Sequence, residues 1–145
     1  MIGHPRIISY LQRAVNHEFN AAQQYTLQAG SAETWGLQDL AGKLRRDARE
    51  ELEHAEAFIT HMMHLGATPR AGQPPRAPRV GETHAELLGF GLATELEAIR
   101  LYSEAVRYCE QIGDADCHAL FSRILKDEQD HARGLEQSFA ALGAG

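Results

Sequence analysis

An internal repeat constrains the fold of this 145-residue chain more than any other feature. Each half holds a single glutamate and, 33 positions later, the glutamate of a Glu-x-x-His pair. A shift of 77 positions carries Glu18, Glu51 and His54 onto Glu95, Glu128 and His131. The same shift relates Tyr25 to Tyr102 and Glu50 to Asp127. A repeat of this length is too long for a solenoid array and indicates a bundle built from two similar halves.

Each half contains two amphipathic segments in which apolar residues recur at the three-and-four spacing of a helix. The predicted helices cover about residues 5–33, 35–65, 83–112 and 115–142. Residues 66–82 carry four of the five prolines and no period, so they predict an irregular crossover that can join two parallel helices. The prediction is a single all-α domain over residues 1–145, a four-helix bundle with one long crossover between helices 2 and 3.

Acidic and imidazole side chains occupy positions where the apolar faces of these helices call for leucine. Buried carboxylates without positive partners are costly, and the nearby lysines and arginines fall off the buried faces. Two divalent cations would offset four glutamates, and carboxylates with one imidazole per metal suit iron, or manganese, better than a structural zinc site. The predicted ligands of this dinuclear centre, with Glu51 and Glu128 as bridges, are Glu18, Glu51, His54, Glu95, Glu128 and His131.

Two further matched pairs point to the same centre. Glu50 and Asp127 each stand four residues before a predicted ligand histidine, so we expect them to accept hydrogen bonds that orient the imidazoles. Tyr25 and Tyr102 lie two helical turns after Glu18 and Glu95. Their phenols are predicted to take a catalytic part, by hydrogen bonding to a ligand carboxylate or by giving up an electron, although either ring can also be a core filler.

Composition excludes several classes of function. The net charge of −6 disfavours non-specific binding to nucleic acid. No apolar run is long enough to span a membrane, and the first residues lack a secretory core, so we expect a cytoplasmic protein. Cys109 and Cys117 match no zinc spacing and are expected to be inert, and a redox role for them stays open.

These motifs resemble those of the bacterioferritins, within the ferritin-like superfamily. The resemblance covers roughly residues 7–142 and is carried by Gln24-Tyr25, Trp35-Gly36-Leu37, Glu51-x-x-His54 and the run from Ile124 to His131. It implies a ferritin-like fold, the same six ligands and ferroxidase activity, in which Fe(II) is oxidised to Fe(III) by dioxygen or hydrogen peroxide for storage. It also implies a homo-oligomer, between a dimer and a 24-subunit cage.

The sequence departs from the bacterioferritin pattern in three places. The methionine that binds haem between two subunits is replaced by Leu52, which argues against haem. Arg46 stands where the inner-surface iron site has a histidine, although Asp47 and Glu50 remain acidic. A fifth helix after the bundle is not evident, which leaves cage assembly and mineral storage open.

Two other functions compete with the ferroxidase. A rubrerythrin-like diiron peroxidase usually has an extra glutamate one turn after the third-helix ligand, but this chain has Ala98 there. A non-catalytic metal-binding assembly subunit would not need all six ligands. The physiological oxidant, the electron donor and the metal loaded in the cell stay open.

Overall fold

The structure, a computed structural model, describes residues 3–70 and 77–144. Its helices are α1 (Pro5–Thr34), α2 (Gln38–His64), α3 (His84–Ile112) and α4 (Ala115–Ala144), and the described residues form no strand. The predicted all-α class is confirmed. None of the described helices is sufficiently long and apolar to cross a lipid bilayer.

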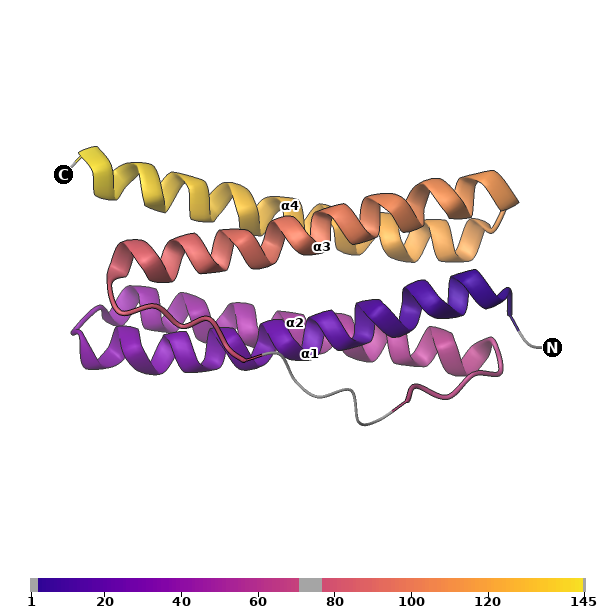
Figure 1. The fold of residues 1–145 in the computed structure, drawn as a ribbon, viewed down its shortest axis with the longest axis horizontal. Coiled ribbons are helices and arrows are strands. Elements are labelled where there is room, and N and C mark those ends of the chain that lie inside the picture. The colour runs from indigo at the N-terminus through magenta and orange to yellow at the C-terminus, as the bar shows by residue number, and fades with distance from the viewer. Residues whose placement is uncertain (1–2, 71–76, 145) are drawn as a thin grey trace.

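The four helices form two antiparallel hairpins, α1 with α2 and α3 with α4, laid side by side (Figure 1). α2 ends at the end of the bundle where α1 begins, whereas α3 starts at the opposite end, so α2 and α3 run parallel. This is the topology expected from a proline-rich connection too long for a hairpin turn.

The turn between α1 and α2 corrects one predicted boundary. Helix 2 was expected to start at Trp35, but α1 continues to Thr34 and α2 begins at Gln38. Gly36 has a φ of +79° and its N–H donates to the carbonyl of Glu33, which closes α1 in the left-handed conformation that glycine favours. The local glycine therefore overrides the apolar period of the following residues.

Two buried glutamines of α1 hold the crossover at its two ends. Gln12 Oε1 accepts a hydrogen bond of 2.7 Å from the backbone N–H of Arg70. Gln28 Nε2 donates to the carbonyls of Arg79, Val80 and Leu87 at 3.1–3.2 Å. These contacts satisfy backbone groups that a loop packed on a helix would otherwise leave without partners.

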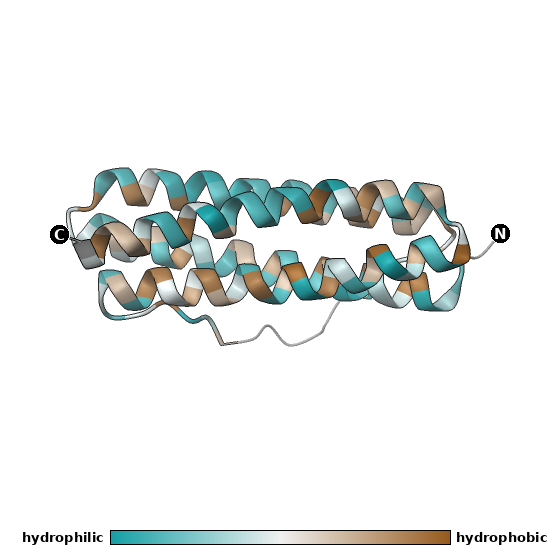
Figure 2. Ribbon diagram, turned by 90° about the horizontal axis from the view of Figure 1, so that it is seen from above, coloured by the Kyte–Doolittle hydropathy of each residue, from teal (hydrophilic) through white to brown (hydrophobic). Residues whose placement is uncertain are grey.

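The hydrophobic core is divided into two clusters, and every helix alternates between hydrophobic and hydrophilic residues along its length (Figure 2). One cluster contains the mutually tilted rings of Phe58, Tyr102 and Phe121, with centroids 5.1–5.8 Å apart. The other contains Tyr25 and Leu44. Along each helix the predicted ligands fall between residues of the two clusters, so a polar layer lies inside the bundle with apolar packing on both sides.

Candidate metal centre

The six predicted ligands converge in this polar layer, one glutamate from α1, one from α3, and a Glu-His pair from each of α2 and α4. The four glutamates are almost fully buried, at 0–1% exposure. The helical period places both members of each pair on the inward face, because residues three apart lie on the same side of a helix. No lysine or arginine among the described residues forms an ion pair with any of these four carboxylates.

The ligand atoms form two overlapping groups, within each of which all atoms lie within 4.8 Å of one another. Site A consists of Glu18, Glu51, His54 and Glu128. Site B consists of Glu51, Glu95, Glu128 and His131. Glu51 and Glu128 belong to both groups, as the repeat predicts for bridging carboxylates, whereas Glu18 and Glu95 each belong to one.

The imidazole Nδ1 atoms are the nitrogens that face the carboxylates. In site A, His54 Nδ1 lies 3.4–3.5 Å from oxygens of Glu18, Glu51 and Glu128. In site B, His131 Nδ1 lies at the same distances from oxygens of Glu51, Glu95 and Glu128. One nitrogen surrounded by three carboxylates is the ligand chemistry of an Fe(II) or Mn(II) site.

Many of these buried atoms have no hydrogen-bond partner within the described chain. They are both oxygens of Glu51 and Glu128, one oxygen each of Glu18 and Glu95, and Nδ1 of His54 and His131. Buried polar atoms are almost always hydrogen-bonded, so this concentration in one layer needs another explanation. A pair of cations fits this donor set, because each of these carboxylate oxygens and imidazole nitrogens is of a type that binds a metal.

The pKa values in the metal-free protein reflect the burial of these groups and the charges around them. Burial, with the charges of Glu18 and Glu128 next, raises the pKa of Glu51 well above its usual value. Burial likewise raises the pKa of Glu128 to about 8. Burial alone would lower the pKa of His54, but hydrogen bonding to Glu18 and the negative charges around it raise it to about 9. In the same way the pKa of His131 rises to about 12. Protons therefore supply the positive charge that metal would bring.

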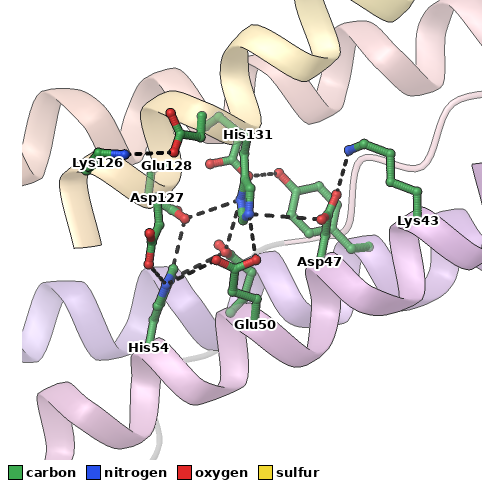
Figure 3. Close-up of polar contacts among 12 residues, drawn as sticks. Lys43, Asp47, Glu50, His54, Lys126, Asp127, Glu128 and His131 are labelled. Carbon is green, nitrogen blue, oxygen red and sulfur yellow. Dashed lines mark hydrogen bonds and ion pairs between the residues drawn. The ribbon is translucent and has the colours of Figure 1, made fainter. Parts of the chain in front are cut away.

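Glu50 and Asp127 contact the imidazoles, but each reaches the histidine of the other helix (Figure 3). Asp127 Oδ2 lies 3.0 Å from His54 Nε2, and Glu50 Oε2 lies 2.9 Å from His131 Nε2. The sequence spacing suggested pairing within one helix, yet Glu50 and His54 are 3.9 Å apart. A carboxylate on Nε2 holds its proton there and leaves Nδ1 available for metal.

The hydroxyl groups of the two tyrosines also contact glutamates in the other half of the chain. The hydroxyl of Tyr25 donates to Glu95, and that of Tyr102 donates to Glu18 Oε1 at 2.6 Å. Burial, followed by the charge of the adjacent glutamate, raises the pKa of both phenols well above the usual value, so both are protonated donors. Each tyrosine thus orients a carboxylate that belongs to a single site.

Asp47 also lies near an imidazole, which the sequence did not lead us to predict. Asp47 Oδ1 lies 4.0 Å from His131 Nε2, and its other oxygen pairs with Lys43 at 2.9 Å. Asp47, Glu50 and His131 form a further group of potential ligands on the outer side of site B. The signal in the sequence was the position of Asp47 one turn before Glu51, on the same face of the helix.

Cys109 and Cys117 lie in the last turn of α3 and the first turn of α4, on either side of the turn between these helices. Both are free and buried. Burial raises the pKa of the Cys109 thiol to about 11 and that of Cys117 still higher. Cys117 Sγ lies 3.1 Å from His61 Nε2. Protonated, buried thiols are poor nucleophiles, in keeping with the expectation that they are inert.

Comparison with known proteins places the chain in one family. Residues 8–142 match the ferritin-like domain family. The chain is 35% identical to bacterioferritin from Rhodobacter capsulatus over 99% of its own length and 96% of that protein. It is 32% identical to a bacterial ferritin from Synechocystis, over 98% and 91% of the two chains.

A solved structure agrees with these sequence relatives. The structure is that of Rhodobacter capsulatus bacterioferritin with a metal-free dinuclear site and a haem iron. It superimposes with a TM-score of 0.95 and 33% identity, covering 99% of this chain and 89% of the other. The predicted resemblance and the ferritin-like bundle are therefore confirmed. The chain belongs to the ferritin-like family, and its similarity to the bacterioferritins extends over nearly its full length.

Proposed function

We propose that this protein is a ferroxidase that binds two Fe(II) ions per chain at sites A and B and oxidises them to Fe(III). The observation that carries the proposal is the set of orphaned ligand atoms, buried in two overlapping groups that share Glu51 and Glu128. Four ionised carboxylates balance the charge of two divalent ions. A site that only bound protons would not require this balance. Iron storage in the family supports the same reading.

The chain's own residues would do three things for this reaction. Glu18 and Glu95 would each contribute to one site, while Glu51 and Glu128 would contribute ligand oxygens to both. Asp127 and Glu50 would keep His54 and His131 in the tautomer that presents Nδ1. Two bound Fe(II) ions together supply two electrons, enough to reduce peroxide to water or dioxygen to peroxide.

Anaerobic addition of Fe(II) followed by air tests this function. We expect binding to saturate at about two irons per chain, followed by rapid growth of the near-ultraviolet absorption of Fe(III). A Glu51→Gln/Glu128→Gln variant should oxidise Fe(II) no faster than buffer. Saturable binding without oxidation would identify a non-catalytic metal-binding subunit instead.

The peroxidase alternative receives no support from the third helix. Ala98, which stands where the extra glutamate would be, is fully buried in the apolar cluster. The adjacent acid, Glu97, pairs with Arg79 of the crossover at 3.1 Å. Comparing the rates of Fe(II) oxidation by peroxide and by dioxygen decides between the two oxidants.

We further propose that the protein works as a homo-oligomer in the cytoplasm and uses no haem. Several large apolar side chains of the α1–α2 hairpin are exposed in the single chain, including Phe19, Leu27 and Leu52 at 43–47%. Such side chains suit a surface that packs against a second copy. Light scattering would give the assembly mass and separate a dimer from a cage.

A further inference from the structure

A pocket of about 310 Å³ lies beside the candidate metal centre, between α2 and α4. It has room for several water molecules at roughly 30 Å³ each, so it can hold a polyatomic ion. Its lining comprises Arg46, Arg49, Glu50, Glu53, His54, Arg123 and Asp127. Two of the arginines come from α2, one turn apart, and the third faces them from α4.

The three arginines of the pocket form no ion pair with the residues that the structure describes. Arg45, Arg79 and Arg133 each form an ion pair with a carboxylate. None of the guanidinium groups of Arg46, Arg49 and Arg123 makes an ion pair or hydrogen bond with another of the described residues. Each therefore keeps its five N–H donors for a ligand or for water.

Two of the three acids in the pocket, Asp127 and Glu50, are engaged by imidazoles, whereas Glu53 is exposed at its edge. Asp127 accepts from His54 at 3.0 Å, and Glu50 accepts from His131 at 2.9 Å, as Figure 3 shows. These bonds hold both carboxylates toward the imidazoles and away from the arginines. The pocket consequently presents three permanent positive charges around one opening, with Glu53 as the one acid that no imidazole engages.

We propose that this pocket binds a small tetrahedral oxyanion, inorganic phosphate, through Arg46, Arg49 and Arg123. The planar fork of a guanidinium matches two oxygens of a phosphate, and three forks from two helices can surround it. A long polyanion such as nucleic acid is disfavoured by the net charge of −6. If the proposed ferroxidase function holds, the anion lies beside His54 of site A.

Calorimetric titration of the metal-free protein with sodium phosphate in chloride buffer tests the site without any iron chemistry. We expect saturable binding of about one phosphate per chain, weakened about tenfold or more in an Arg49→Gln/Arg123→Gln variant. The matched control is Arg100→Gln/Arg107→Gln, which removes the same charge from two exposed residues of α3 and should change affinity less than twofold. Circular dichroism establishes that both variants fold.

Three results would overturn the proposal. They are the absence of saturation below about 10 mM phosphate, equal weakening in both variants, and tighter binding of duplex DNA that displaces phosphate. The third would assign the arginines to a nucleic-acid surface. Because the titration contains no metal, its failure leaves the ferroxidase proposal untouched, and failure of Fe(II) oxidation leaves the phosphate site untouched.

Discussion

Glu50 of α2 lies 2.9 Å from Nε2 of His131 on α4. His54, four positions after Glu50 on α2, lies 3.0 Å from Asp127 of α4. The two hairpins of the bundle are therefore joined at the metal centre by a reciprocal exchange of acceptors. Each imidazole is oriented by the hairpin to which it does not belong. Site A and site B consequently depend on the packing of α2 against α4 as well as on their own ligands.

The exchange predicts which substitution weakens which site. In a His54→Ala background only site B keeps its imidazole. In that background Glu50→Gln should lower metal affinity about 10-fold or more, whereas Asp127→Asn should have little effect. A His131→Ala background should reverse the order. Co(II) titration followed by its visible absorption measures both. Pairing within one helix, as the spacing of the sequence suggests, predicts the opposite assignment.

Removing a bridging carboxylate should stabilise the metal-free protein. The pKa of Glu51 is raised in the folded state, so the folded chain binds more protons than the unfolded chain, and stability is lost as pH rises above about 4.5. Glu51→Gln removes this loss of folding stability at higher pH. We expect its stabilisation to be small at pH 5 and about 1–2 kcal/mol at pH 8, or a rise in Tm of about 2–4 °C per kcal/mol. Exposed Glu56→Gln is the control, and a Tm gain independent of pH would contradict the argument.

Metal binding should release protons. With the pKa of Glu128 at about 8 and that of His54 at about 9, the metal-free centre holds protons at pH 7 that a metal must displace. Calorimetry of Co(II) binding in buffers with different ionisation enthalpies gives the number released, and affinity should rise from pH 6 to pH 8. An apparent enthalpy that is the same in every buffer would show that the centre is already deprotonated.

The phenol of Tyr102 should stabilise the protein and site A together. Its hydrogen bond of 2.6 Å to Glu18 is buried, and Tyr102→Phe leaves that oxygen without a donor. We expect a loss of about 1–3 kcal/mol in the metal-free protein and weaker binding at site A. Tyr108→Phe, whose hydroxyl contacts His4 at the surface, should cost less than about 0.5 kcal/mol. Thermal unfolding and Co(II) titration measure the two effects, and equal losses in both variants would exclude a special role for Tyr102.

Haem binding should depend on which residue stands at position 52. The side chain of Leu52 is 47% exposed and offers no sulfur ligand to a haem iron. Mixed with haem, the protein should show no thioether-ligated absorption spectrum, whereas Leu52→Met should bind about one haem per two chains. Leu96→Met, at an equally exposed position on α3, is the control. Stoichiometric haem binding by the unaltered protein would overturn the prediction.

The amino-acid sequence by itself determined the helical segments and the residues proposed as ligands. Periodicity along one helix decides which side chains share a face, and a glutamate or histidine on an apolar face stands out because burying it is costly. That reasoning found Glu18, Glu51, His54 and their counterparts in the second half. It erred at Trp35, where a single glycine with positive φ ends the preceding helix.

Only the tertiary structure decided the partners of these residues. Glu50 contacts His131 instead of His54, and Tyr25 contacts Glu95 instead of Glu18, because packing brings side chains of facing helices closer than neighbours on one helix. The unpaired arginines beside the centre likewise became visible only when α2 and α4 were placed together. Spacing along the chain limits which residues share a helix face, whereas helix packing selects the atoms that meet across it.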